Sequence, residues 1–306
     1  MKAILLLCFA SLLPAQQPYF DLIHISDTHI ADFAGVHPDL KQARRANLDS
    51  LSTFETFSRN FSRTIAQSPR TALLHTGDIV DAVCFDGEAG QPVYGQIEFV
   101  KRTLAPLAYR SYLALGNHDV ECYRRDTSTP PRAIGDQSVA AQARSLWAKQ
   151  FRILRKRTYY SVPLKVAKTR YRLYVLDNGQ SLDAGGREFF VSQMAWLEKE
   201  LLRHPQERPL IAMHIPLNPA AANDERSRMA LQALRAAKLS AVVLCGHRHS
   251  DALETFDNFG QKIVSVRTAA LSRGPDTWRR IRLYADRVEV FATGPVGTVL
   301  ATVSTF

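Results

Sequence analysis

Apolar residues recur along the chain in short runs that alternate with amphipathic stretches. Runs rich in β-branched and aromatic residues predict strands at 19–26, 71–75 and 112–115. Between the first two, apolar residues spaced by three and four predict a helix over 47–65. A further helix is predicted over 92–104, with Pro92 near its first turn. This alternation is typical of an α/β layered fold.

The second half of the chain continues the alternation and then becomes rich in strands. Residues 121–137 are polar and contain Pro130-Pro131 and Gly135, which predicts a long loop. The pattern then predicts a helix at 139–151, a hairpin at 159–162 and 171–176, a helix at 192–202, a strand at 210–213, a helix at 224–238 and a strand at 241–244. Short strands and turns are expected after residue 250. Because no repeat or linker is visible, residues 16–306 are predicted to form one domain.

The N-terminus has the pattern of a secretory signal. Lys2 precedes an apolar run over 3–13, and Pro14-Ala15 follows. The run is too short for a membrane span, which takes about 20 residues, and no later stretch approaches that length. We therefore predict that residues 1–15 are a signal peptide and that the mature protein is exported to the periplasm or the extracellular space. That compartment would be oxidising.

Composition and charge narrow the class of partner. The chain has 306 residues, of which 46% are hydrophobic and 22% charged, values that exclude general disorder, collagen and coiled coil. Lys and Arg number 39 and Asp and Glu number 29, so the formal net charge is +10. Such an excess favours an anionic partner, which could be a phosphate ester, nucleic acid or an anionic membrane surface. Four cysteines exclude a disulfide-rich scaffold.

Residues that can bind metals follow five of the predicted strands. The clusters are Asp27-Thr28-His29, Gly77-Asp78, Gly116-Asn117-His118-Asp119, His214 and Gly246-His247-Arg248-His249. Ligand sites in α/β sheets lie beyond the carboxyl ends of strands, so we expect the five clusters to converge. Carboxylate, imidazole and amide groups are ligands of Zn, Mn and Fe. Seven candidate ligands are too many for one ion and suit two ions about 3.5–4 Å apart, an arrangement that serves phosphoryl displacement.

Taken together, these clusters resemble those of the calcineurin-like metallophosphoesterases. The family pattern is Asp-x-His, Gly-Asp-x-x-Asp, Gly-Asn-His-Asp/Glu, a lone His and Gly-His-x-His, and every element occurs between residues 27 and 249. The resemblance implies a four-layer α/β/β/α sandwich of two mixed sheets flanked by helices, with the metal site at the C-terminal edge of the strands. The second and third elements look like those of the phosphodiesterase branch.

The resemblance also implies a set of metal ligands. One metal would be held by Asp27, His29, Asp78 and His249, and the other by Asp78, Asn117, His214 and His247, with Asp78 bridging. The ions could be Mn, Fe, Zn or Ni. A hydroxide between them would be the nucleophile, because each ion lowers the pKa of bound water. The neutral His and Asn ligands would leave the site positive, which favours an anionic substrate.

Two further residues have implied catalytic roles. His118 would not bind metal but would face the phosphate, where it would stabilise charge or protonate the leaving oxygen. Asp81 matches the family position that orients this histidine, and a carboxylate there would favour the protonated ring. In the similar purple acid phosphatases a metal-bound Tyr stands at this position. With Asp81 in its place, a Tyr-ligated ferric ion is not expected.

The implied Asp81–His118 pairing would also bring two cysteines together. Cys84 lies six residues after Asp78, and Cys122 lies four residues after His118. We predict that they form a disulfide, which would tether the loops of the bridging Asp and the catalytic His. Cys245, at the end of a buried strand, is expected to remain a free thiol.

Other candidates have a structural and a functional interpretation. His24 and His75 lie within strands and are expected to be satisfied core residues, whereas His37 could border the pocket. The arginines Arg124, Arg125 and Arg248 could contact substrate or lie at the surface. Arg152, Arg155, Lys156 and Arg157 cluster at a helix end, where the helix dipole explains them better than nucleic acid does.

The favoured function is hydrolysis of a small phosphodiester by a secreted two-metal enzyme. A phosphomonoesterase is the next alternative. A nuclease has only the positive charge in its favour, so nucleic acid is not the favoured partner. A non-catalytic metal-binding protein is the last alternative. Substrate identity, metal identity and oligomeric state stay open.

Overall fold

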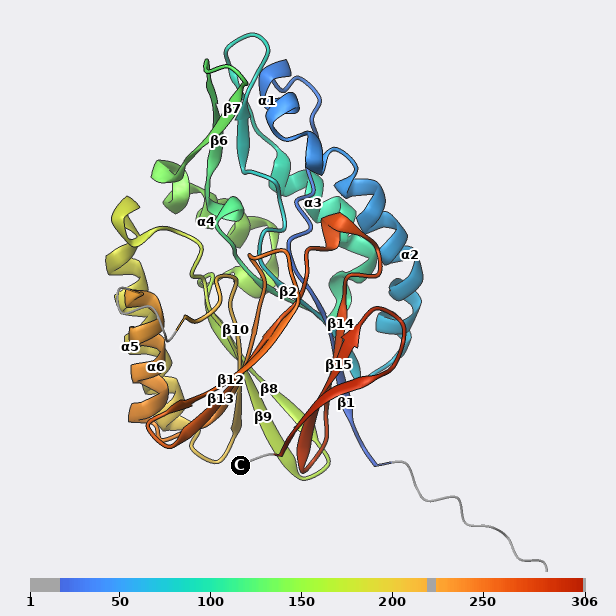
Figure 1. The fold of residues 1–306 in the computed structure, drawn as a ribbon, viewed down its shortest axis with the longest axis vertical. Helices are drawn as coiled ribbons and strands as arrows, with labels where there is room; N and C mark the ends of the chain where they lie inside the picture. Colours follow the sequence, from blue (N-terminus) through green and yellow to red (C-terminus); the bar gives the residue numbers. More distant parts are fainter. Residues whose placement is uncertain (1–16, 219–223, 305–306) are drawn as a thin grey trace, which may run out of the picture.

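The part of the chain that the structure describes contains two six-stranded sheets and one four-stranded sheet (Figure 1). It is a computed structural model that describes residues 17–218 and 224–304, so the predicted signal peptide at 1–15 lies outside the described residues. The first sheet has the order β16-β15-β14-β1-β2-β5. Its strands are β1 (Phe20–Ile25), β2 (Thr71–Thr76), β5 (Ser111–Ala114), β14 (Arg279–Leu283), β15 (Arg287–Thr293) and β16 (Val299–Ser304).

The second sheet has the order β12-β13-β11-β10-β9-β8. Its strands are β8 (Tyr160–Val166), β9 (Thr169–Val175), β10 (Arg208–Ala212), β11 (Ala241–Cys245), β12 (Ala252–Asn258) and β13 (Gln261–Arg267). Both large sheets are mixed. In the first, β1 pairs in parallel with β2 and antiparallel with β14; in the second, β10 pairs in parallel with both β9 and β11, and β12 runs antiparallel to β13.

Helices cover the outer faces of both large sheets. The first face carries α2 (Ser50–Gln67), α3 (Gln96–Leu104) and α4 (Ala140–Gln150), and the second carries α5 (Arg187–Arg203) and α6 (Glu225–Ala236), as Figure 1 shows. Helix α1 (Pro38–Ala43) lies beside the small sheet. Single turns occur at Arg45–Asn47, Ala105–Arg110, His118–Val120, Gln137–Val139, Arg152–Leu154, Leu182–Gly186 and Leu271–Arg273.

Three buried apolar layers separate these elements. Ile23 and Leu73 point from β1 and β2 toward the helices of the first layer, whereas Leu22 and Leu74 point toward the second sheet. A third cluster joins the second sheet to α5 and α6. Strands buried on both faces read as continuous apolar runs, which is why β1 and β2 could be predicted from sequence. The predicted four-layer α/β/β/α sandwich is confirmed.

The small sheet overturns one prediction and adjusts another. It is formed by β3 (Cys84–Asp86), β4 (Pro92–Val93), β6 (Cys122–Asp126) and β7 (Arg132–Asp136). The loop predicted at 121–137 is therefore wrong, since most of it is a β-hairpin. Only the first two residues of β6 are buried, so the strand does not need alternating apolar residues. Its polar sequence therefore gave no strand pattern. The helix predicted over 92–104 begins instead at Gln96, because Pro92–Val93 pairs with β3.

The other predicted elements are confirmed within a few residues, but the C-terminal strands divide in a way the pattern did not show. β12 and β13 extend the second sheet, while β14, β15 and β16 extend the first. Pairing partners of this kind are set by contacts far apart in sequence. Among the described residues, no helix combines the length and apolar character that crossing a bilayer requires.

Candidate metal centre

The five sequence clusters meet at one edge of the sandwich, beyond the carboxyl ends of five strands. Asp27 and His29 follow β1, Asp78 follows β2, Asn117 and His118 follow β5, His214 follows β10, and His247 and His249 follow β11. The strands end at the same edge because all five run in one direction within their two sheets. The structure therefore brings together six of the seven predicted ligands, Asp27, His29, Asp78, His214, His247 and His249. Asn117 and His118 follow the neighbouring strand β5, and Nε2 of His118 is 3.8 Å from Oδ2 of Asp78.

One group of ligand atoms comes from Asp27, His29, Asp78 and His249. These atoms lie within 4.8 Å of one another. Nε2 of His249 is 3.2 Å from Oδ1 of Asp27, and Nε2 of His29 is 3.9 Å from Oδ2 of Asp78. The Nε2 atoms of the two histidines are 3.1 Å apart. Two carboxylates and two imidazoles at this spacing fit one divalent ion.

A second group comes from Asp78, His214 and His247, also within 4.8 Å. Nε2 of His214 is 3.0 Å from Oδ2 of Asp78, and Nδ1 of His247 is 3.2 Å from Nε2 of His214. Oδ1 of Asn117 is buried and has no hydrogen-bond partner among the residues that the structure describes. A buried acceptor of this kind is expected to have a partner. The donor set and this orphaned oxygen fit a second divalent ion.

Asp78 belongs to both groups, as its predicted bridging position requires. Glycine at 116 allows its close approach, since a Cβ there would lie 2.2 Å from Oδ1 of Asp78. Burial alone would raise the pKa of the Asp78 carboxyl, but the His214 and His118 rings hold it well below its usual range. The carboxylate is therefore ionised and can neutralise charge from two cations.

The orientation of His214 is fixed by a backbone carbonyl. Nδ1 of His214 lies 2.8 Å from the carbonyl oxygen of Thr76, so Nδ1 carries the proton and Nε2 faces Asp78. A backbone acceptor of this kind orients a metal-binding imidazole. Burial would lower the pKa of His214, but the Asp78 carboxylate outweighs it and raises the pKa to about 9. Oδ1 of Asn178 accepts hydrogen bonds from the backbone of His214 and Ile215, which holds the loop in place.

Backbone strain is concentrated at the predicted ligands. Five of them have a positive φ between 45° and 71°: Asp27, His29, Asp78, His247 and His249. Side chains other than glycine rarely adopt this conformation, and each instance costs about 1–3 kcal/mol. Hydrogen bonds between the loops hold it, such as the one from the backbone N–H of His247 to Oδ2 of Asp27 at 3.0 Å. Strain of this kind clusters at functional sites.

Comparison with known proteins decides the family. The sequence model of the calcineurin-like phosphoesterases matches residues 20–251. The chain belongs to the calcineurin-like phosphoesterase family. It is therefore a metal-dependent hydrolase of phosphoric esters, and its family uses two divalent metal ions. Among curated protein sequences, none matches this chain.

Solved structures share the fold of this phosphoesterase. A dimetal phosphatase from Danio rerio is similar with a TM-score of 0.59 and 16% identity, covering 94% of this chain and 100% of that one. GAP50, the anchor in the inner membrane complex of Plasmodium, is similar with a TM-score of 0.52 and 9% identity, covering 94% and 89%. At these identities the likeness shows the fold alone.

The surroundings of His118 differ from those expected for a calcineurin-like phosphoesterase. Asp81 was expected to orient the ring through its carboxylate. Instead Nδ1 of His118 lies 2.8 Å from the backbone carbonyl oxygen of Asp81. Nε2 points to the metal centre and is 3.8 Å from Oδ2 of Asp78. Asp81 thus contacts His118, but the predicted carboxylate–imidazole pair is not formed.

The Asp81 carboxylate is occupied elsewhere. It accepts two hydrogen bonds from the Arg44 guanidinium and one of 2.7 Å from Nδ2 of Asn47. Its Oδ1 also lies 3.4 Å from Nδ1 of the candidate ligand His29. Burial would raise the pKa of the Asp81 carboxyl, yet His29 and Arg44 lower it well below its usual range. Asp81 is therefore a buried anion placed behind the candidate metal ligand His29.

Two residues that sequence reasoning missed complete the surroundings of His118. The Tyr123 hydroxyl is 2.9 Å from Nδ1 of His118, and Oε1 of Glu121 is 3.6 Å from the same nitrogen. The Arg44 guanidinium lies over the Tyr123 ring, 4.7 Å from its centroid. Both residues lie at the start of the hairpin that was predicted to be a loop. The sequence did contain one signal, because residues two apart in an extended chain, such as Glu121 and Tyr123, lie on the same face.

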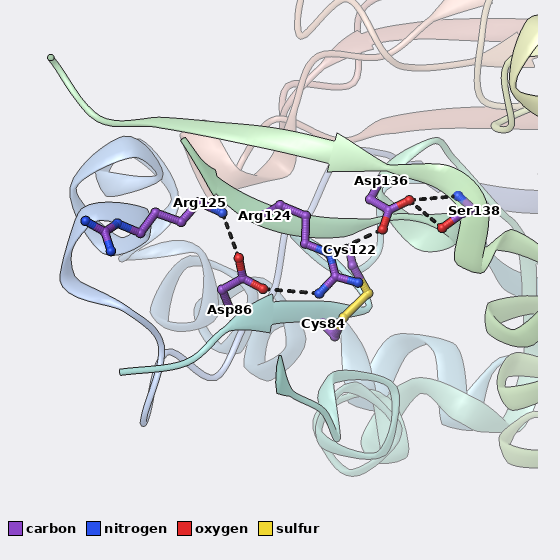
Figure 2. The surroundings of a disulfide bond; sticks show 7 residues. All are labelled: Cys84, Asp86, Cys122, Arg124, Arg125, Asp136 and Ser138. Carbon is purple, nitrogen blue, oxygen red and sulfur yellow. Dashed lines mark hydrogen bonds and ion pairs between the residues drawn. A yellow bond between two sulfur atoms is a disulfide. The ribbon is translucent and has the colours of Figure 1, made fainter. Parts of the chain in front are cut away.

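The predicted disulfide between Cys84 and Cys122 is present, and Cys245 is a buried free cysteine as expected. Cys84 and Cys122 are directly opposite each other in the parallel strands β3 and β6. Figure 2 shows the bond beside the ion pairs that Arg124 forms with Asp86 and Asp136. Because Cys122 lies between Glu121 and Tyr123, the disulfide anchors the segment that contacts His118.

Most of the remaining candidates have structural contacts, while substrate contact by Arg248 stays a prediction. His24 bonds the hydroxyls of Thr76 and Thr268 within the core, and His75 bonds Thr28 and the backbone of Gly77, as expected. His37 caps α1 and is in neither ligand group. Arg124 and Arg125 are engaged in ion pairs with Asp86, Asp136 and Asp39, and Arg248 is exposed.

Proposed function

We propose that this chain is an exported phosphodiesterase that hydrolyses a small phosphodiester at two divalent metals. The observation that carries the proposal is the position of Asp78, which is shared by two ligand groups and lies 3.8 Å from Nε2 of His118. A phosphate placed at the two ions would therefore meet both fixed positive charge and an imidazole. The Gly77-Asp78-x-x-Asp81 and Gly116-Asn117-His118-Asp119 motifs support the diester preference.

The candidate ligands and His118 would have different roles in the reaction. Asp27, His29, Asp78 and His249 would hold one ion, and Asp78, Asn117, His214 and His247 the other. Bound ions would lower the pKa of water and neutralise phosphate charge. Nδ1 of His118 donates a hydrogen bond to the Asp81 carbonyl, which turns Nε2 toward the site. As water adds to phosphorus and the bond to the leaving oxygen breaks, the imidazolium form of His118 would pass its Nε2 proton to the leaving oxygen, and the proton released by the water would return the ring to that form.

A matched pair of esters tests the diester preference. Bis(p-nitrophenyl) phosphate and p-nitrophenyl phosphate have the same leaving group and differ in the second ester. We expect kcat/KM to be at least tenfold higher for the diester. A reversed ratio would identify a phosphomonoesterase, and faster cleavage of single-stranded DNA than of either small ester would identify a nuclease. Asp78→Asn serves as the control for contaminating activity.

Export is supported by the Cys84–Cys122 disulfide, because structural disulfides persist in oxidising compartments. The test is N-terminal sequencing of the protein recovered outside the cytoplasm. We expect the mature chain to begin near residue 16 and to contain the disulfide. A cytoplasmic protein that keeps residues 1–15 and has free thiols at both positions would contradict export.

A further inference from the structure

Two open hollows meet on the side of the sandwich, where the edge strands β5 and β8 approach each other. The first, of about 660 Å³, lies between the end of α3, β5 and residues 150–153. The second, of about 490 Å³, lies between residues 152–157, the start of β8 and α5. Arg152 and Ile153 line both hollows. We call the pair the edge groove.

The first hollow has an apolar floor. The side chains of Leu104, Tyr112, Leu113, Phe151 and Ile153 line it. Leu104 and Leu113 are buried, while Phe151 and Ile153 are half-buried and pack against the core below. Tyr160 from β8 closes the join between the sheets, because its hydroxyl bonds both the backbone N–H and the C=O of Leu113. The floor is thus a fixed part of the fold.

The rim of the edge groove is basic. Lys101 and Arg110 line the first hollow, Arg152 lines both, and Arg155, Lys156 and Arg157 line the second. Glu200 is the one acidic residue among the described residues that line them, and it pairs with Arg203. Arg152, Arg155 and Lys156 are exposed and form no ion pair within the described part of the chain. The groove therefore has uncompensated positive charge next to apolar surface.

Trp196, an aromatic residue that lines the second hollow, is not available for stacking. The Arg157 guanidinium lies over both Tyr159 and Trp196, at 5.2 and 5.6 Å from the ring centroids. Tyr159 also packs against Trp196, with centroids 5.0 Å apart. Single-stranded nucleic acid is bound through exposed stacking platforms beside basic residues. The second hollow has the charge for that partner, but its Trp196 ring is already covered, and Tyr112 and Phe151 of the first hollow belong to its apolar floor.

We propose that the edge groove binds an anionic amphiphile, a molecule with a phosphate or carboxylate head and a hydrocarbon chain. The head would pair with Arg152, Arg155 and Lys156, and the chain would cover Phe151 and Ile153 in the first hollow. A floor of apolar side chains with a few convergent charged groups is the usual composition of a small-molecule site. This inference does not depend on hydrolysis at the metal centre, since the groove has its own charge and floor.

Calorimetry with alkyl phosphates of different chain length tests the proposal. The holoenzyme is titrated with butyl or decyl phosphate below its micelle concentration. Inorganic phosphate is present at one fixed concentration, so its competition with the phosphate head, at the metal centre or in the edge groove, is the same in both titrations. Each buried methylene strengthens binding by about fourfold, so we expect decyl phosphate to bind at least 100-fold more tightly than butyl phosphate. Equal affinities for the two would overturn the proposal without any need for a variant.

Charge variants locate the site. In Arg152→Gln/Arg155→Gln/Lys156→Gln, which changes exposed side chains only, decyl phosphate is expected to bind about tenfold more weakly, with hydrolysis at the metal centre unchanged. Lys168→Gln/Arg170→Gln removes exposed basic charge from the β8–β9 hairpin and is the control. If both variants lost affinity for decyl phosphate equally, net charge alone would explain the binding and the proposal would be overturned. So would tighter binding of a single-stranded oligonucleotide at the same residues.

Vesicles separate the two sources of such an amphiphile. Co-sedimentation with phosphatidylglycerol vesicles but not phosphatidylcholine vesicles, lost in the triple variant, would support the proposal with a membrane lipid as the ligand. Binding of monomeric decyl phosphate without vesicle binding would support it with a free amphiphile as the ligand.

Discussion

His118 is held by the backbone of Asp81, whose carboxylate bonds Arg44 and lies within 4.8 Å of a His118 ring nitrogen without bonding it. Nδ1 of His118 lies 2.8 Å from the Asp81 carbonyl oxygen, while the carboxylate bonds the Arg44 guanidinium. The side chain of Asp81 is instead next to the candidate ligand His29, at 3.4 Å. Asp81 therefore contacts the candidate metal ligand His29 with its side chain and His118 with its backbone.

Asp81→Asn separates these two contacts. The amide keeps the size of the side chain and leaves the carbonyl that holds His118 unchanged. Loss of the charge behind His29 should weaken the first metal by about 10–100-fold, the usual effect of removing such an outer partner. The ratio of rates for alkyl and p-nitrophenyl phosphodiesters at saturating metal should stay close to that of the wild type. If only the rate of alkyl phosphodiester hydrolysis fell strongly, the Asp81 carboxylate would be the group that orients His118, contrary to this account.

His118→Ala should act through the leaving group. If Nε2 protonates the leaving oxygen, the loss for an alkyl phosphodiester should be about 10²–10⁴-fold, and much smaller for bis(p-nitrophenyl) phosphate, whose phenolate leaves unaided. Metal content should stay at the wild-type value, because His118 is in neither of the two groups assigned to a metal. Equal losses on both esters would indicate charge stabilisation, and loss of metal would make His118 a ligand.

Glu121→Gln and Tyr123→Phe extend this prediction to the residues behind His118. Each removes one group near Nδ1 of His118. Each should therefore lower the rate of alkyl phosphodiester hydrolysis, as His118→Ala does, but by less. The two esters measured side by side distinguish this from a general loss of folding, which would lower both rates equally. Ser138→Ala is a nearby control, since Ser138 bonds Asp136 and, within the described part of the chain, neither Glu121 nor His118.

Reduction of the disulfide should affect both stability and catalysis. Cys84 and Cys122 are 38 residues apart, and closing a loop of this size stabilises a fold by about 2–4 kcal/mol in the chain-entropy description. Cys84→Ser/Cys122→Ser should therefore unfold at lower urea concentration. It should also lower the rate of alkyl phosphodiester hydrolysis, because Cys122 lies between Glu121 and Tyr123. Cys245→Ser is the matched control. Unchanged stability and an unchanged rate in the double variant would show that the disulfide supports neither the fold nor the candidate site.

Metal binding at the second group should release a proton. The pKa of His214 is raised to about 9 in the metal-free fold, so its ring is protonated at pH 7, and a metal ligand must be neutral. Affinity should therefore rise with pH until about 9. The Asp78–His214 pair stabilises the metal-free fold fully below the ordinary His pKa, and that contribution is lost as pH rises through about 9. Calorimetry in buffers of different ionisation enthalpy counts the proton; no release at pH 7 would contradict the raised pKa.

The ligands could be predicted from sequence because each follows a buried strand and the sheet brings strand ends together. Asp27, Asp78 and His214 needed only the local pattern and the direction of their strands. Glu121 and Tyr123 could not be recognised in the same way, because β6 is a short strand of a small sheet and pairs with β3, which lies far back in the sequence. Asp81 contacts His118 through its backbone because Arg44 and Asn47 bind its carboxylate. Those two contacts are made by tertiary packing and could not be predicted from the local sequence.

The central claim is that two ions share Asp78, and a metal titration followed by activity tests it most directly. Metal-free protein is titrated with Mn²⁺, and bound metal and hydrolysis of bis(p-nitrophenyl) phosphate are measured at each point. We expect two bound ions per chain, with activity that follows occupancy of the second, and fewer than two ions in Asp78→Asn with activity lower by orders of magnitude. Full activity at one ion per chain, or two ions retained in Asp78→Asn, would contradict it.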